Sequence, residues 1–286
     1  MALHQGVEAE DARSASIPGG GDGAQRWEAE EAQRLYQAER RRRSETLLSR
    51  RRPGLTVDEA YLVQWCGTTL RIGTGARVVG HKVGLTSAAM QRQIGIDEPD
   101  FGVLLDSMIV GAGGVLWAGD LLAPRIEAEI AFRLGTDVGG PDITGHDVHA
   151  AVAEVFLALE VIDSRFDLAG ITVADNVADN AGAARCVLGA AASLPEWDLR
   201  DERLTVRVGT HEVATGEGRD VLGDPLRSVA WLARRLHAFG TGLAAGEVVL
   251  AGAVHASFPL PVGKTVSVHS PRLPSVSLHI APGHSY

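Results

Sequence analysis

The chain has 286 residues, and 45% of them are hydrophobic, which is enough to bury a substantial core and excludes a wholly disordered protein. The formal net charge of -9 argues against a general nucleic-acid binder and is typical of a cytoplasmic enzyme. The two cysteines are too few for a disulfide framework or a cysteine-rich zinc site, and no apolar run is long enough to cross a bilayer, so we expect a cytoplasmic protein without a membrane partner.

The N-terminal part of the sequence predicts a tail followed by two helices. Residues 1–25 lack the basic start and the apolar stretch of a signal peptide, and their content of Gly, Ala, Ser and acids predicts a flexible tail. Residues 27–52 have a charged helical pattern in which arginine clusters lie among many glutamates, which indicates a solvated helix face. A capping-box signature, Thr56 followed by Glu59, predicts a second helix to about Leu70.

The rest of the chain alternates between short strands and two helices. Strands are predicted in "RVVGHKVG", over residues 124–134 and 155–162, and in "EVVLAG", "TVSVHS" and "SVSLHI". A short helix is predicted in "TSAAMQRQIG", closed by Gly95. The clearest helix is "GDPLRSVAWLARRLHAFG", where Asp224 is the expected N-cap and Pro225 lies in the first turn.

These elements predict a single α+β domain. No internal repeat and no internal linker interrupts the sequence after the tail. We therefore predict one domain over residues 26–286, with a helical part over 26–75 and a β-rich core over 76–286.

Three glutamates are the strongest candidates for a metal site. Glu127 and Glu129 lie two apart in "RIEAEIAF", so a strand places them on the same face. Glu160 directly follows the apolar run "VFLAL". Three converging carboxylates suit a hard cation such as Mg²⁺ or Mn²⁺. The alternative is an edge strand whose glutamates are solvated, and the spacing alone leaves both interpretations open.

Lys82 and several polar residues also lie in apolar or small surroundings. Lys82, in "VVGHKVGLTS", would need an anionic partner or a lowered pKa if it is buried, and the alternative is snorkelling from a strand end. Asp100 in "EPDFGVLLD" and the Asp179-Asn180 pair in "NVADNAGAA" are either site residues or turn formers.

Other motifs favour structural interpretations. His146 and His149 could meet on a helix, but their position at a helix start favours the surface. "RIGTGARVVG" misses the dinucleotide-binding spacing, and Cys186 in "RCVLGA" is typical of core packing.

Seven segments in order resemble the 2-keto-4-pentenoate hydratase family, within the fumarylacetoacetate hydrolase superfamily. They are "PGLTVDEAYLVQ", "GHKVGLTSAAMQRQIGIDEPDFGVLLDSM", "PRIEAEIAFRLG", "ALEVIDSRF", "VADNAGAARCVLG", "GDPLRSVAWLARRL" and "GEVVLAGA". The resemblance implies a mixed β-roll of the fumarylacetoacetate hydrolase C-terminal type with outer helices, assembly into homo-oligomers, and action on small 2-oxo or 2-hydroxy-dienoic acids from aromatic-ring degradation.

The resemblance also implies roles for individual residues. Glu127, Glu129 and Glu160 match the divalent-metal ligands, usually for Mg²⁺ or Mn²⁺, and Lys82 and Asp100 match catalytic residues near the substrate. The residues expected to bind substrate are Leu85, Thr86, Ser87, Phe101, Arg125, Asp163, Asp179 and His255.

The implied activity is a metal-dependent lyase that hydrates 2-hydroxy-2,4-dienoates to 4-hydroxy-2-oxo acids. The alternatives are a 2-oxo-enoate decarboxylase of the 4-oxalocrotonate type, a specialised biosynthetic enzyme of the same fold, and a non-catalytic binding protein. Intact Glu127, Glu129, Glu160 and Lys82 argue against the last. Gly182, where serine is expected, and His255 in "LAGAVHASFP" depart from the family pattern and bear on the substrate.

Overall fold

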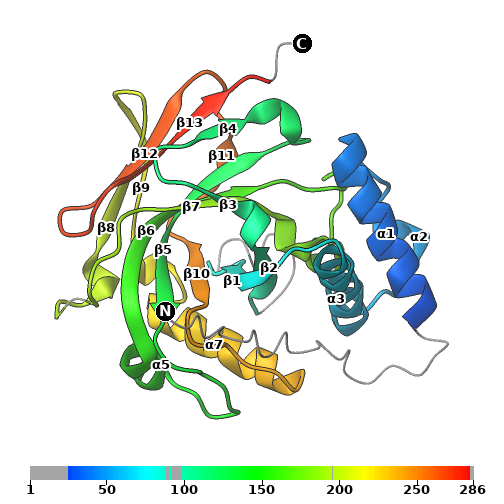
Figure 1. The fold of residues 1–286 in the computed structure, drawn as a ribbon, viewed down its shortest axis with the longest axis horizontal. Coiled ribbons are helices and arrows are strands. Elements are labelled where there is room, and N and C mark those ends of the chain that lie inside the picture. The colour runs from blue at the N-terminus through cyan, green and yellow to red at the C-terminus, as the bar shows by residue number, and fades with distance from the viewer. Residues whose placement is uncertain (1–24, 88–90, 92–97, 195, 284–286) are drawn as a thin grey trace, which may run out of the picture.

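A computed structural model describes residues 25–87, 91, 98–194 and 196–283 of the chain (Figure 1). The helices are α1 Gln25–Arg41, α2 Leu48–Arg51, α3 Val57–Gly73, α5 Gly145–Ala151, α6 Val173–Ala178 and α7 Pro225–Ala238. The strands are β1 Val78–Gly84, β2 Asp100–Leu105, β3 Ile109–Val110, β4 Val115–Trp117, β5 Arg125–Leu134, β6 Val152–Ile162, β7 Ala183–Leu188, β8 Arg203–Val208, β9 His211–Glu217, β10 Val248–Ala253, β11 Phe258–Pro259, β12 Thr265–His269 and β13 Val276–Ala281.

The first two helices do not form the continuous segment that the pattern over residues 27–52 predicts. α1 ends at Arg41, and Arg42 has a left-handed backbone conformation with a φ of 51°. The chain then runs extended, and the N–H of Glu45 donates to the carbonyl of Arg165 at 2.8 Å. This long-range pairing explains the break, because an extended segment cannot also close helical hydrogen bonds.

The capping signals predict the starts of α3 and α7 correctly. The Thr56 hydroxyl accepts from the Glu59 N–H at 3.2 Å, and the Glu59 carboxylate accepts from the Thr56 N–H at 2.9 Å, so the capping box that opens α3 is complete. The Asp224 side chain accepts from the Leu226 N–H at 2.9 Å and opens α7. These caps satisfy backbone donors that have no partner inside the helix.

Some expectations concern parts of the chain outside the described residues. The predicted tail lies there almost entirely, and so does most of the short helix expected to end at Gly95. Among the helices that the structure does describe, none has the length and apolar character needed to cross a bilayer.

The larger sheet is mixed and carries the long central strands. Its order is β2-β1-β10-β5-β6-β7-β3, and β11 pairs with β5 beyond the end of β10. β1 and β10 are parallel, whereas β10, β5, β6 and β7 are successively antiparallel. β5 therefore lies in the interior of the sheet, with β6 on one side and β10 and β11 on the other (Figure 1).

The second sheet and the helices cover the larger sheet. The second sheet has the order β4-β13-β12-β8-β9, and its alternating buried residues, such as Val266, Val268, Leu278 and Ile280, pack into the main core. α1, α2 and α3 lie together at one side of the molecule, and α7 lies beneath β10 (Figure 1). The result is the predicted α+β architecture, a β-rich core of curled mixed sheets with helices outside.

Candidate active site

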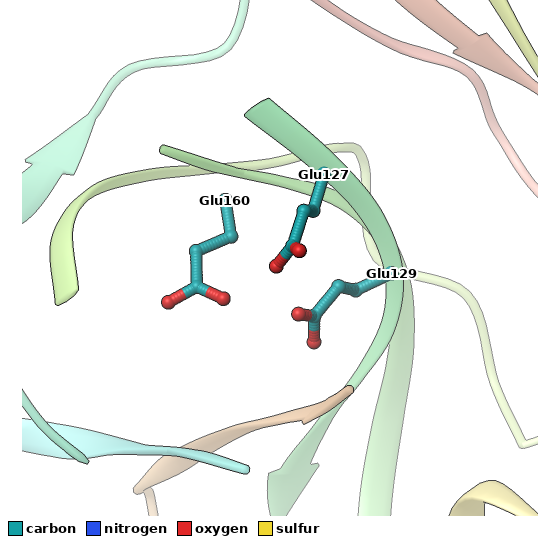
Figure 2. A group of neighbouring side chains, drawn as sticks. All are labelled: Glu127, Glu129 and Glu160. Carbon is teal, nitrogen blue, oxygen red and sulfur yellow. The ribbon is translucent and has the colours of Figure 1, made fainter. Parts of the chain in front are cut away.

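Register between two central strands brings the three glutamates together. Glu127 on β5 lies directly opposite Glu160 on β6, and Glu129 lies two residues further along the same face of β5. One oxygen of each carboxylate lies within 4.8 Å of the other two. Figure 2 shows the three side chains pointing toward one another. The edge-strand alternative is wrong, because Glu129 and Glu160 are 0% exposed and Glu127 is 7% exposed.

The three carboxylates have few hydrogen-bond donors. A bulge in β10 aims the N–H of Gly252 at Glu129 Oε2, at 2.7 Å. Glu129 Oε1 and both carboxylate oxygens of Glu160 have no hydrogen-bond partner. Buried carboxylate oxygens without donors are unstable as anions, so the cluster fits a bound cation that would complete it.

The electrostatics of the cluster also fit a cation. Burial, with repulsion from Glu160, raises the pKa of Glu127 to about 7. Burial raises the pKa of Glu129 well above its ordinary value, and the negative charges of Glu160 and Glu127 add to the shift. Without a cation the three groups cannot all ionise at low cost, and a divalent ion among them removes that cost.

Lys82 is the cationic side chain nearest to the cluster. It is 3% exposed, and its Nζ lies 3.4 Å from Glu160 Oε1. Burial alone would lower the pKa of Lys82, but the carboxylates of Glu160, Asp100, Glu127 and Glu129 together outweigh burial and raise it. The snorkelling alternative is therefore wrong, because Lys82 is buried against the anionic partner that the sequence called for.

Asp100 faces Lys82 across a glycine. Asp100 at the start of β2 pairs with Gly84 at the end of β1. A Cβ atom on Gly84 would lie 2.3 Å from Asp100 Oδ1 and 3.2 Å from Lys82 Nζ, so only glycine leaves room for the acid and the base to approach. Burial raises the pKa of Asp100, while the Lys82 charge and a hydrogen bond from Asn176 oppose that shift.

Asn176 is a site residue that the sequence analysis missed. Its amide nitrogen donates to Asp100 Oδ2 at 2.6 Å, whereas Asp100 Oδ1 has no hydrogen-bond partner. The Asp-Asn pair that we singled out is the second one in "ADNVADN", and Asn176 belongs to the first. The available sequence signal was a capping-box pattern, Thr172 followed by Asp175, which opens the short helix α6 that carries Asn176.

A cavity of about 570 Å³ lies over these residues. Six of the residues expected to bind substrate line it together with Lys82, Glu127, Asn176 and Gly182: Leu85, Thr86, Ser87, Arg125, Asp163 and His255. Hydrogen bonds within the protein hold the side chains of Arg125 and Asp163 in place. The Arg125 Nε donates to the Ser257 hydroxyl at 2.7 Å, and the Asp163 carboxylate accepts from the N–H groups of Leu122 and Ala123.

Phe101 and Asp179 do not lie at the cavity, and both predictions are corrected. Neighbouring residues on a strand face opposite ways, so with Asp100 turned toward Lys82 the Phe101 ring stacks on Tyr61 with 4.5 Å between centroids. Asp179 is buried in an ion pair, where its Oδ1 accepts from the Arg165 Nε at 2.5 Å. His146 and His149 are exposed on α5, and Cys186 is buried in the core.

The buried ion pair gives a stability prediction. Asp179→Ala should lower the free energy of unfolding by about 3–5 kcal/mol, because it removes the carboxylate that is directly paired with the buried Arg165 guanidinium. Denaturant unfolding measures the loss. The matched control is Arg200→Ala, which breaks an exposed pair with Asp198 and should leave the free energy of unfolding nearly unchanged. A raised KM with unchanged stability in Asp179→Ala would instead place Asp179 at the substrate.

Comparisons with known proteins show which proteins this chain resembles. The family model described as fumarylacetoacetate (FAA) hydrolase C-terminal matches residues 72–281. The chain is 40% identical over 241 residues to 2-keto-4-pentenoate hydratase of Paraburkholderia xenovorans (strain LB400), covering 84% of this chain and 90% of the relative. It is 39% identical to 2-hydroxyhexa-2,4-dienoate hydratase of Comamonas testosteroni, covering 82% and 89%.

A solved structure is similar over nearly its whole length. The 4-oxalocrotonate decarboxylase from Pseudomonas putida G7, complexed with magnesium and adipate, superposes with a TM-score of 0.86 at 35% identity, covering 89% of this chain and 97% of that one. The same decarboxylase complexed with calcium and acetate gives a TM-score of 0.85. Similarity therefore extends to hydratases by sequence and to a decarboxylase by structure.

Proposed function

This chain belongs to the fumarylacetoacetate hydrolase family, and we propose that it is a metal-dependent hydratase that converts 2-hydroxy-2,4-dienoates to 4-hydroxy-2-oxo acids. The observation that carries the proposal is the cluster of three buried carboxylates, poor in hydrogen bonds, under the cavity. Its relatives at about 40% identity are hydratases, and both they and the similar decarboxylase are lyases.

The enzyme works with a divalent cation, and we propose Mg²⁺ or Mn²⁺ as its identity. Glu127, Glu129 and Glu160 would hold the ion, because carboxylate oxygens are the ligands that these hard cations prefer. When bound, the cation supplies positive charge that stabilises negative charge on the 2-oxygen of the substrate.

Lys82 on β1 lines the cavity, Asp100 at the start of β2 is buried behind Gly84 without lining it, and we propose that both act on the substrate from this side. The Lys82 ammonium lies beside Glu160, where its charge stabilises an oxyanion while the dienol and ketone forms interconvert. The hydratase reaction also protonates C5 and adds water at C4, so a proton carrier is needed. Asp100 suits that role, because Asn176 fixes Oδ2 and leaves Oδ1 without a hydrogen-bond partner.

Decarboxylation is the second candidate, because the similar solved structure is a decarboxylase. One assay separates the two activities. Metal-loaded protein is mixed with 2-hydroxypenta-2,4-dienoate and, separately, with 4-oxalocrotonate, while ultraviolet absorbance is followed and products are identified by NMR. We expect 4-hydroxy-2-oxopentanoate from the dienoate. Release of CO₂ from 4-oxalocrotonate without hydration of the dienoate would overturn the hydratase proposal.

The pKa of Glu127 predicts how metal binding depends on pH. The pKa of this carboxyl group rises to about 7 on folding, so the folded protein holds its proton more tightly than the unfolded chain does. The resulting contribution to the free energy of unfolding is complete below the ordinary pKa and is lost as pH rises through 7. The metal-free protein should therefore lose this contribution between about pH 4.5 and about pH 7.

A cation competes with the same protons, so the rise in melting temperature on adding Mn²⁺ should grow over that range. Thermal unfolding with and without Mn²⁺ at each pH measures the difference. A stabilisation that shrinks as pH rises would contradict the site.

We also propose assembly into homo-oligomers and a cytoplasmic location. The family resemblance supports the first. The cytoplasmic location fits the two cysteines, because both are free thiols. Light scattering of the purified protein tests the assembly.

A further inference from the structure

We infer that His255 is a positioning residue for the metal ligands, because its imidazole replaces a missing backbone acceptor on the strand that carries Glu127 and Glu129. The inference rests on the proposed metal site. It concerns a residue that we expected to bind substrate and that does line the cavity.

The hydrogen-bonded ladder that β5 forms with β10 and β11 is interrupted next to Glu127 and Glu129. Ala253, at the end of β10, pairs with Glu129, and Phe258, at the start of β11, pairs with Ile126. β5 advances by three residues between these two pairs, while its partner advances by five. Residues 254–257 therefore loop out of the regular ladder, in the manner of an enlarged β-bulge.

This loop leaves one backbone donor of β5 without a strand partner. The Ala128 carbonyl still accepts from the Val254 N–H, at 3.2 Å. The Val254 carbonyl, which would pair with the Ala128 N–H in a regular ladder, instead lies against Gly216, where a Cβ atom would come within 2.0 Å of it. Ala128 is 0% exposed, so water cannot reach its N–H, and an unpaired donor there is costly.

The imidazole of His255 fills this gap. The Ala128 N–H donates to His255 Nε2 at 3.1 Å. The other ring nitrogen, Nδ1, lies 2.8 Å from the Ala256 carbonyl and therefore carries the proton. The ring stacks near Phe258, with centroids 5.9 Å apart. Both nitrogens are occupied by backbone groups, so His255 has no free nitrogen to act as an acid or base on the substrate.

His255 matters for the metal because the peptide group that it holds, at Ala128, lies between two of the metal ligands. Ala128 lies between Glu127 and Glu129, whose side chains leave the strand on the same face. A turn of the backbone at Ala128 would move both carboxylates, and a cation tolerates little change in ligand geometry. Loss of a partner that orients metal ligands typically lowers metal affinity by about 10- to 100-fold.

The test is Mn²⁺ affinity of chelator-stripped protein, measured from free Mn²⁺ by electron paramagnetic resonance. His255→Phe keeps a planar ring for packing but has no acceptor, and it should bind Mn²⁺ about tenfold more weakly or worse. His255→Gln can offer its side-chain carbonyl to the Ala128 N–H, and it should remain within about threefold of the wild type. Melting temperatures of the metal-free variants are measured alongside.

Each outcome decides a separate question. Wild-type affinity in His255→Phe would overturn the inference, and so would equal losses of affinity in both variants. If the wild-type protein itself does not bind Mn²⁺, the proposed metal site fails before His255 is tested. Should His255→Phe not fold, ¹⁵N NMR of the wild-type histidines decides. The inference requires a proton on Nδ1 and none on Nε2 of His255, and the opposite tautomer would overturn it.

Discussion

Replacing Glu160 with glutamine should abolish metal-dependent turnover of 2-hydroxy-2,4-dienoates while leaving the fold intact. Glu160 lies directly opposite Glu127 across the β5–β6 ladder and has no hydrogen-bond donor on either oxygen. Glutamine keeps the shape of the side chain but removes one of the three negative charges, and it offers one weaker oxygen ligand to a hard cation. Mn²⁺ affinity and turnover are measured on the same stripped and reloaded protein.

Stability distinguishes loss of the metal from loss of the fold. The charge of Glu160 is the largest electrostatic contribution that raises the pKa of Glu127 and of Glu129. Lys82 loses its ion-pair partner in this variant but keeps the carboxylates of Asp100, Glu127 and Glu129 nearby, so the metal-free variant should still fold, with a melting temperature close to that of the wild type. The matched control is Glu154→Gln on the same strand, which breaks a half-exposed pair with Arg133 and should keep full activity. Metal-dependent turnover in Glu160→Gln at the wild-type rate would remove Glu160 from the site.

Strand periodicity in the sequence predicts only part of the glutamate cluster. Glu127 and Glu129 share a face because they lie two residues apart on a strand. Their partner Glu160 depends on the register between β5 and β6, which is fixed by contacts that no local pattern encodes. Family resemblance identified Glu160 as the third member. The structure gives the physical reason, because Glu127 and Glu160 lie directly opposite each other on neighbouring strands.

Phe101 and Asp179 lie away from the cavity for different physical reasons. Asp100 and Phe101 are neighbours on one strand, so their side chains point to opposite faces, and with Asp100 turned toward Lys82 the Phe101 ring packs against Tyr61. Asp179 is different. Its partner Arg165 comes from another segment, and a buried aspartate in a structural ion pair has the same sequence signature as a functional one.

Two further features that the sequence did not predict depend on long-range backbone geometry. The break after α1 follows from the pairing of Glu45 with Arg165, and the role of His255 follows from a loop that removes one ladder acceptor from β5. Neither feature has a local sequence signal, because the residues involved have ordinary propensities where they stand. Helix starts were predictable by contrast, since the capping residue and the N–H that it accepts lie within one turn.

Lys82→Met should lower kcat by about 100-fold or more, the scale expected for loss of a group that stabilises charge or moves a proton in the transition state. Methionine keeps most of the length and apolar character of the lysine side chain but carries no charge. The ammonium lies 3.4 Å from Glu160 and is buried, so its positive charge opposes a cation held by the same carboxylate. Metal affinity in Lys82→Met should consequently be unchanged or tighter while turnover falls.

That opposition between turnover and metal affinity makes the test decisive. Replacing a residue that only supports the metal site would lower turnover and metal affinity together. Lys82→Arg should not restore turnover, because the planar guanidinium is larger than ammonium and does not fit the same buried position. The other lysine of the chain, Lys264, is exposed, and Lys264→Met is the matched control that should leave kcat and Mn²⁺ affinity unchanged. Full kcat in Lys82→Met would show that the buried ammonium only balances the charge of its neighbours and takes no part in the reaction.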